Sequence, residues 1–169
     1  MAAGSTYTPI ATTTLGTAQS SVSFSSFSGY TDLVLVIQAR QTGAYTAQQI
    51  VFRWNGDSGT NYSETTLQGT GTSAVSSRDA NISFAYLGSC PSGNATAGVF
   101  GNLIVNFMNY SNSTTYKTVL ARENNALGEA LAAVSVYRSN SPITSISIAA
   151  DTNNFAAGST FTLWGILNA

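Results

Sequence analysis

The sequence contains no histidine, only one cysteine and few charged residues. Without an imidazole, the chain lacks the base that activates Ser-His-Asp and Cys-His nucleophiles, and it lacks the commonest ligand of catalytic zinc. The single cysteine, Cys90, excludes an intrachain disulfide and a cysteine-based zinc site, and its Gly- and Ser-rich surroundings predict an incidental thiol in a turn. These absences exclude most enzymes that depend on histidine or on a reactive thiol.

Charge is scarce, at 8% of residues against about 25% in an average soluble domain. The six basic and seven acidic residues are scattered singly, so no concentrated basic patch exists to neutralise phosphates, and we expect no nucleic-acid partner. Ser, Thr and Asn are abundant instead, so the polarity of the surface comes from hydroxyl and amide groups. A near-neutral surface of this kind favours association with other protein copies, although a plain compositional bias towards Thr and Asn would give the same balance.

Long apolar runs are also missing. No 18-residue apolar span could cross a membrane, and the amino terminus lacks the basic and apolar regions of a signal peptide. We therefore expect no membrane partner.

What the sequence does contain is an apolar stretch, Leu33–Ile37, within Tyr30–Arg40. Three of its five residues are β-branched, which favours a strand over a helical turn. Because the run is apolar at every position rather than at every second one, we expect a strand buried on both faces, in the middle of a sandwich.

Segments in which apolar and polar residues alternate, such as Val22 and Phe24 among serines, predict nine or ten short strands. We expect an exposed loop at Thr72–Asp79. Between Arg122 and Ala133 we expect at most one helical turn. Parallel sheets need crossover helices, so we predict an all-β, antiparallel two-sheet β-sandwich, with a jelly roll as the first choice. An immunoglobulin-like sandwich is the runner-up, but its Cys, Trp, Cys signature is missing. The predicted core comprises Leu33, Leu35, Ile37, Phe52, Phe84, Tyr86, Ile104, Ile146, Phe161 and Leu163.

The amino-terminal region is uncharged from Met1 to Thr31, unlike a solvated disordered tail. We predict an extended N-terminal arm or edge strand over residues 1–19 and a β-sandwich domain over 20–169. As an arm, the segment would contact a sister subunit or a capsid through Tyr7, Pro9, Ile10 and Leu15. The alternative is an ordinary first strand in the sheet of the same chain.

Candidate chemistry is sparse. No two of the seven acidic residues form a motif for paired-carboxylate hydrolysis, and we expect no catalytic residue and no enzymatic activity. Asp57, Asn61 and Glu64 could offer oxygen ligands to calcium, but Asx turns explain them equally well, so we expect no metal and no cofactor. Several aromatic residues could stack on sugar rings, and core packing is the favoured explanation for most of them: Trp54, Tyr62, Tyr86, Tyr110, Tyr116 and Trp164.

Four segments in series carry a resemblance: Tyr30–Leu35, Asn55–Ser63, Tyr116–Thr118 and the closing Phe161–Ile166. Together they resemble a β-domain of tailed-phage (cyanophage-like) virion proteins, of the head-decoration (cement) or tail-fibre type. That family usually ends in Phe-Thr-Leu-Tyr-Gly-Ile, and Trp164 departs from it conservatively. The resemblance implies a non-enzymatic, oligomeric structural protein and transfers no catalytic residue.

The expected function is therefore that of a bacteriophage capsid decoration protein, which stabilises the head through contacts with the major capsid protein. The alternative is a tail fibre or spike domain that binds host-surface carbohydrate. Chain length favours the cement role, because fibres usually need an attachment domain and a shaft. A head protein can sit where three capsid subunits meet, so we expect a homotrimer, located in the virion and assembled in the host bacterial cytoplasm.

Overall fold

Twelve strands make up the part of the chain that the computed structural model describes, residues 6–125 and 128–167. No helix occurs among these residues, and so none is long and apolar enough to cross a membrane. The strands are β1 (Tyr7–Thr14), β2 (Ser21–Ser25), β3 (Asp32–Ala39), β4 (Ala47–Trp54), β5 (Tyr62–Gly69), β6 (Ala74–Ile82), β7 (Ala85–Pro91), β8 (Gly101–Phe107), β9 (Lys117–Asn125), β10 (Glu129–Tyr137), β11 (Ser145–Ala150) and β12 (Thr160–Ile166).

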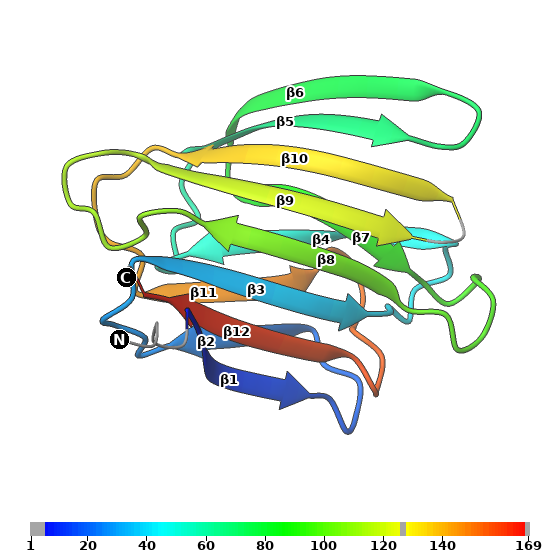
Figure 1. Ribbon diagram of the computed structural model, residues 1–169. Helices are drawn as coiled ribbons and strands as arrows, with labels where there is room; N and C mark the ends of the chain where they lie inside the picture. Colours follow the sequence, from blue (N-terminus) through cyan, green and yellow to red (C-terminus); the bar gives the residue numbers. More distant parts are fainter. Residues whose placement is uncertain (1–5, 126–127, 168–169) are drawn as a thin grey trace.

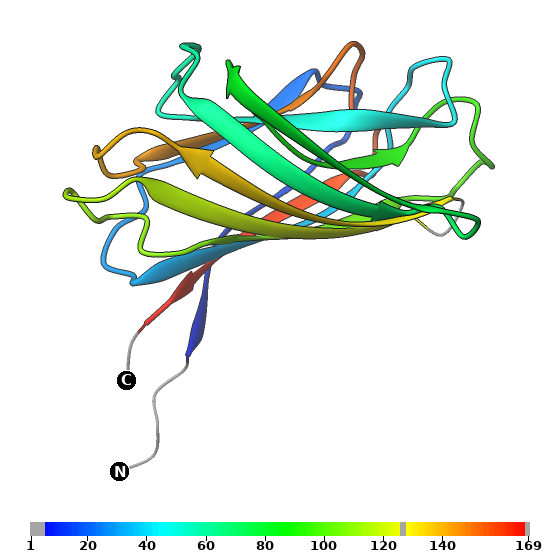
Figure 2. The same cartoon turned by 90° about the horizontal axis from the view of Figure 1, so that it is seen from above.

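The strands form two antiparallel sheets stacked face to face (Figures 1 and 2). The large sheet has eight strands in the order β1-β12-β3-β8-β9-β10-β5-β6, and the small sheet has four in the order β2-β11-β4-β7. The chain passes from one sheet to the other along β1, β2, β3 and β4, as in a jelly roll. The predicted two-sheet antiparallel β-sandwich is confirmed.

The core lies between the sheets, and its largest part faces β3. Leu33, Leu35 and Ile37 are fully buried, as are Phe161 and Leu163 on β12, the strand beside β3. The small sheet covers them with Phe52 and Trp54 on β4 and with Ile146 and Ile148 on β11, and Phe52 and Ile146 were predicted core residues. An aromatic cluster closes one end, where the ring centroid of Tyr62 lies 5.1 Å from that of Trp54 and 5.0 Å from that of Tyr137.

The turn after β4 shows how local sequence sets the direction of the chain. Asn55 and Gly56 both have positive φ, 55° and 67°, and the amide of Asp57 donates to the carbonyl of Trp54 at 3.0 Å. Two successive residues with positive φ are characteristic of a tight type I′ turn, for which Asn-Gly is the preferred pair. The Asn-Gly pair therefore ends β4 in a tight turn.

Four local predictions were wrong. The segment predicted as an exposed loop, Thr72–Asp79, contains most of β6. The segment predicted to form a helical turn, Arg122–Ala133, belongs to β9 and β10 instead; its residues 126–127 lie outside the described part. A bend at Ser83–Phe84 shifts the alternation, so that Ala85 rather than Phe84 enters the core. Ile104 points to the other side of the sheet from its buried neighbours Leu103 and Val105.

Candidate functional site: the outer face of the large sheet

The face of the large sheet that points away from the small sheet, here called the outer face, is the most extensive candidate for a functional site. Residues directly opposite one another in neighbouring strands lie on the same face, so the register maps it. One row runs Leu67, Ala132, Arg122, Ile104, Val36 from β5 to β3. The next row runs Thr65, Val134, Leu120, Asn106, Val34, Trp164 from β5 to β12.

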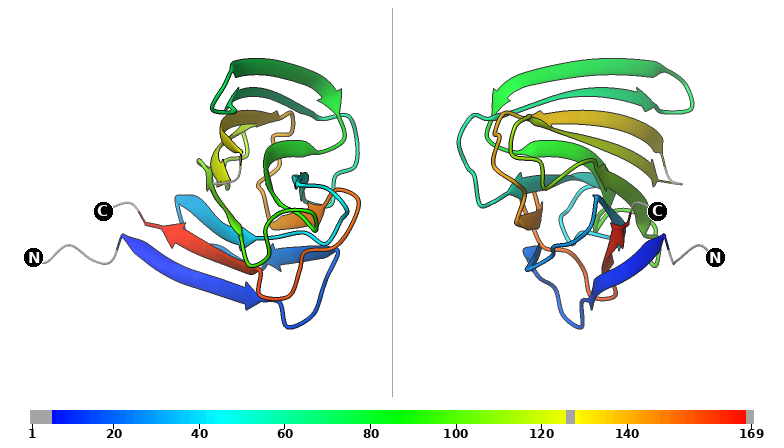
Figure 3. Two further views of the ribbon diagram at one scale, coloured as in Figure 1. Left: turned by 90° about the vertical axis from the view of Figure 1, so that its right-hand side faces the viewer. Right: turned by 60° about the vertical axis from the view of Figure 1, so that its left-hand side comes forward.

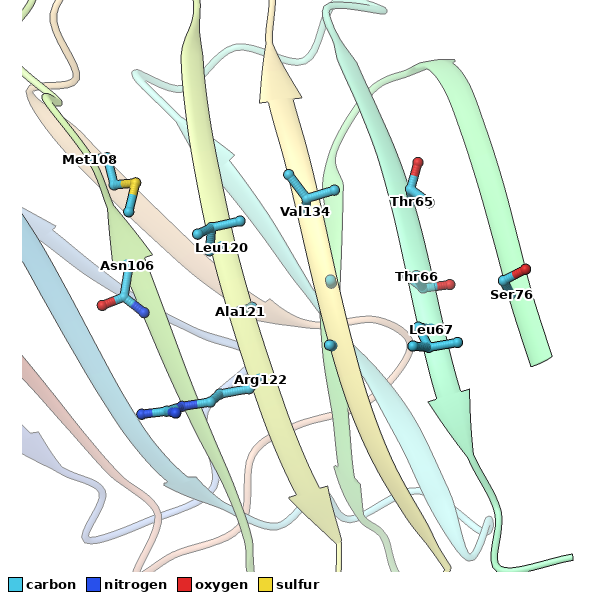
Figure 4. Close-up of a pocket in the computed structure, with 12 residues that line it drawn as sticks. Thr65, Thr66, Leu67, Ser76, Asn106, Met108, Leu120, Ala121, Arg122 and Val134 are labelled. Carbon is cyan, nitrogen blue, oxygen red and sulfur yellow. The ribbon is translucent and has the colours of Figure 1, made fainter. Parts of the chain in front are cut away.

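Much of this face is apolar although it is open to solvent. Leu67 is 59% exposed, Leu120 39% and Val36 38%. A hollow of about 710 Å³ lies over β5, β8, β9 and β10, with Leu67, Leu120 and Val134 in it (Figure 4). A smaller hollow of about 190 Å³ lies between Tyr7, Val34, Val36 and Trp164. Contiguous exposed apolar surface of this kind marks an interaction site in soluble proteins.

Among the residues that the structure describes, Arg122 is the only charged side chain that lines the larger hollow. It lies on β9, two residues from Leu120 and opposite Ile104 of β8. In Figure 4 its side chain extends from β9 towards β8. No hydrogen bond or ion pair joins its side chain to another described residue. The hollow therefore combines an apolar floor with one available guanidinium, which suits a partner surface that carries a carboxylate.

The opposite side of the same strands carries a cluster of acidic residues. Glu64 on β5, Glu123 on β9 and Glu129 on β10 face strand β7 of the small sheet. The amide of Tyr86 donates to Glu64 Oε2, and the amide of Ser89 donates to Glu123 Oε2 at 3.2 Å. The hydroxyl of Ser89 donates to Glu129 Oε1. Three strands of the large sheet thus fasten one strand of the small sheet through carboxyl groups.

Burial controls the ionisation of this carboxyl cluster. Burial raises the pKa of Glu64 to about 7, against the opposing effect of the Tyr86 amide, and Asp79 raises it further. Burial, followed by the like charge of Glu129, raises the pKa of Glu123 to about 7. Glu123 Oε1 is buried with no hydrogen-bond partner among the described residues. A protonated carboxyl is the form that this environment favours.

The carboxyl cluster does not have the geometry of a metal site. Within residues 6–125 and 128–167, no three His, Cys, Asp or Glu side chains are placed to hold a metal ion. Glu64 and Glu123 are only 6% and 4% exposed, and their oxygens bind backbone amides of β7. The cluster joins the two sheets.

The residues considered as calcium ligands, Asp57, Asn61 and Glu64, make other contacts. Asp57 Oδ1 accepts from the amide of Gly59 at 2.7 Å, while its Oδ2 accepts from Asn61 Nδ2 at 2.8 Å. The Asn61 hydrogen bond, followed by that of Gly59, lowers the pKa of Asp57. Glu64 points between the sheets to β7 instead. An Asx turn accounts for Asp57 and Asn61.

The predicted interface residues of the amino-terminal region do not form one surface. Tyr7–Thr14 is an edge strand, β1, paired with β12 of the same chain, so over these residues the edge-strand alternative holds; Met1–Ser5 lie outside the described part. Tyr7 is 54% exposed and borders the outer face, Pro9 is exposed, and Ile10 is partly buried against the core. Leu15 is buried in the core of this chain, so its assignment as an intermolecular contact was wrong.

The aromatic residues considered as sugar platforms are mostly part of the core. Trp54, Tyr62 and Tyr110 are buried, whereas Tyr116 is exposed. Tyr86 is half-buried between the sheets, where burial and then the carboxyl group of Glu129 raise the pKa of its hydroxyl. Cys90 lies in β7 rather than in a turn, and burial raises the pKa of its thiol to about 12, so it is an unreactive core residue.

Sequence reasoning missed the outer face, although one signal for it was present. The apolar run Leu33–Ile37 predicted burial on both faces of its strand, but the small sheet covers only one of them. Val34 retains 7% of its exposure because neighbouring side chains crowd it, whereas Val36 retains 38%. A strand that is apolar on both sides but covered on one was the signal that the sequence offered for the outer face.

Comparisons with known proteins found structural similarity but no match in sequence. No protein-family model matches the sequence, and no curated protein sequence matches it. Among solved structures, the chain is similar to galectin LEC-6 of Caenorhabditis elegans, with 12% identity, a TM-score of 0.34, and coverage of 93% of this chain and 96% of the galectin. It is also similar to alginate lyase vAL-1 from Chlorella virus, with 8% identity, a TM-score of 0.37, and coverage of 94% and 83%.

Proposed function

We propose that this protein works by assembly rather than catalysis, as a capsid decoration protein that binds the major capsid protein of a tailed phage through the outer face. The observation that carries the proposal is the apolar outer face, which nothing in residues 6–125 and 128–167 covers. The phage context comes from the four sequence segments that resemble virion β-domains. Protein surfaces that bury such a face gain about 25 cal/mol for each Å² of apolar area removed from water.

The charge pattern supports a protein partner. Within residues 6–125 and 128–167, Arg122 is the one charged group that lines the larger hollow, so an apolar partner surface with a single carboxylate would leave no buried charge unpaired. Its neighbours in the two central rows are largely Ala, Val, Leu and Ile. Cement function needs such a broad contact and no reaction chemistry.

A matched pair of substitutions tests the proposal. Leu67 on the outer face and Tyr45 in the β3–β4 connection are both 59% exposed, so Asp at either position costs little folding stability. We expect Leu67→Asp and Leu120→Asp to weaken binding to heads that lack this protein by roughly 10- to 100-fold, because each removes one buried apolar anchor. Tyr45→Asp should bind as the unmodified protein does. Unchanged binding by both outer-face variants would overturn the proposal.

A second candidate, a tail fibre or spike domain that binds carbohydrate, rests on the polar residues of the same face. Asn102, Asn106 and Asn124 surround Arg122 and Ile104 and could hydrogen-bond sugar hydroxyls. Glycan-array binding that Asn102→Ala and Asn124→Ala abolish, with labelled protein located on the tail by cryo-EM, would favour this candidate. Binding to heads with no glycan signal would favour the cement role.

A further inference from the structure

Strand β6 forms an open edge of the large sheet. It is the last strand in the sheet order, and its nine residues are exposed on both faces except for the partly buried Ile82 at its end. Figures 1 and 3 show the β5–β6 hairpin projecting beyond the small sheet. Long exposed edges are templates for strand pairing, and proteins usually blunt them with proline, bulges or a covering segment. Between Ala74 and Ala80, β6 has no proline.

The register identifies which backbone groups of β6 are open. The amide of Thr70 donates to the carbonyl of Ser73, its direct partner across the hairpin, so the backbone groups of Ser73 point to β5. Backbone direction alternates along an antiparallel strand. The N–H and C=O groups of Ala74, Ser76, Arg78 and Ala80 therefore point away from β5, and no described residue hydrogen-bonds them.

We propose that this edge pairs with β6 of a second copy of the chain, antiparallel and about a two-fold axis perpendicular to the sheet. A register centred on Ser77 places Ala74 opposite Ala80 of the second copy, and Ser76 opposite Arg78. All four open residues of each strand then hydrogen-bond. The interface is isologous and closes about a two-fold axis, which is the commonest symmetry of homo-oligomers.

Charge selects this register over its neighbours. Centring the pair on Arg78 places two guanidinium groups directly opposite each other, and centring it on Asp79 does the same with two carboxylates. Like charges in directly opposite positions destabilise a strand pair. Centring it on Ser76 pairs Ala80 with a residue beyond the end of β6, which begins at Ala74.

Space on both sides of β6 permits the approach. Because the strand is exposed on the inner as well as the outer face, the small sheet of neither copy obstructs the other. The pairing would join two eight-stranded sheets into one and place two outer faces side by side. This inference is independent of which partner the outer face binds, and it predicts a dimer where the sequence predicted a trimer.

Charge variants at one position test the register. Sedimentation equilibrium of the purified protein should give twice the chain mass of 17.6 kDa at high concentration. Ser76→Lys places a second cation opposite Arg78 in both pairs of the dimer and should weaken dimerisation roughly 2- to 30-fold, whereas Ser76→Glu should strengthen it by a similar factor. Thr12→Lys adds the same charge at the exposed β1 edge and should have no effect. Equal responses to Lys and Glu at position 76 would overturn the register.

Hydrogen exchange tests the edge without any substitution. The amides of Val75, Ser77 and Asp79, which point to β5, should be protected at all concentrations. The amides of Ala74, Ser76, Arg78 and Ala80 should become protected only as the dimer forms. A monomeric or trimeric mass at every concentration would overturn the proposal. Protection of these four amides that appears only on binding to heads would do so too, because the edge would then accept a strand of the capsid protein.

Discussion

The β1 end and the β6 end of the large sheet are built differently. At the β1 end, β12 and β3 carry an apolar inner surface that the small sheet covers completely, with Leu35 and Leu163 fully buried. At the β6 end, β5, β9 and β10 meet β7 through the carboxyl cluster, and β6 extends beyond any cover. The inner surface of the first end is apolar, whereas at the second end carboxyl groups that can titrate lie among apolar core residues such as Leu131 and Ala133.

The two edge strands of the large sheet, β1 and β6, also differ in how readily they could pair with another strand. In β1, Pro9 lies opposite Trp164, and the amide of Leu167 donates to the carbonyl of Thr6. Because backbone direction alternates, the backbone of Pro9 faces the free edge of the sheet, where proline has no N–H to offer to another strand. The register shift between Pro9 and Ala11 disrupts the edge further. β6 has neither device between Ala74 and Ala80. One edge is blunted and the other is open.

The largest effect should come from the apolar end. Leu35→Ala leaves a cavity between β3 and the small sheet, and we expect the free energy of unfolding to fall by about 2–5 kcal/mol in urea denaturation. Val36→Ala, one residue away on the outer face, should cost less than about 1 kcal/mol, because Val36 is 38% exposed. Equal losses for the two variants would show that the outer face is packed in the isolated protein.

The acidic end should make stability fall as pH rises. Glu64 and Glu123 have pKa values raised to about 7 in the folded chain, against about 4.3 for an unfolded glutamate. Between these values the folded state binds more protons than the unfolded state, so the free energy of unfolding decreases with pH. We expect a loss of about 2–3 kcal/mol per carboxyl between pH 5 and pH 8, complete above pH 7.

Denaturation at several pH values checks this slope. Glu64→Gln and Glu123→Gln should each flatten it, because an amide has no proton to lose in this range. Thr65→Val, the outward neighbour of Glu64 on β5, is the matched control and should keep the full slope. A stability that instead rises from pH 5 to pH 8 in the unmodified protein would contradict the buried, proton-binding arrangement.

The same two ends differ in how far the sequence could predict them. The β1 end follows from local patterns: β-branched, apolar residues at Leu33–Ile37 indicated an internal strand, and the predicted core residues Leu33, Leu35 and Ile37 are buried. Alternation alone could not assign Ile104, because Leu103, Ile104 and Val105 are all apolar and only the pairing with β3 decides which of them face inward.

The β6 end depends on information that no single segment contains. A strand exposed on both faces has no hydrophobic alternation, so Ala74–Asp79 was predicted as part of a loop. The carboxyl cluster joins Glu64 to Glu123 and Glu129, and they come together only through the registers of β5, β9 and β10 and the stacking of β7. The outer face needs the same registers before its two apolar rows become visible.

The smallest effect should come from restoring the backbone N–H that Pro9 lacks at the edge of β1. Pro9→Ala gives β1 an N–H that points to solvent, so no contact within the chain is gained, while the unfolded chain becomes more flexible. We expect the free energy of unfolding to fall by only about 0.4–1 kcal/mol in urea denaturation. Because a pairing site is restored, sedimentation equilibrium should also show weak association beyond that of the unmodified protein. A loss above about 2 kcal/mol would mean that the exposed Pro9 ring supports the fold and does not merely blunt the edge. Unchanged association together with a small loss would assign the blunting to the register shift at Pro9–Ala11 instead.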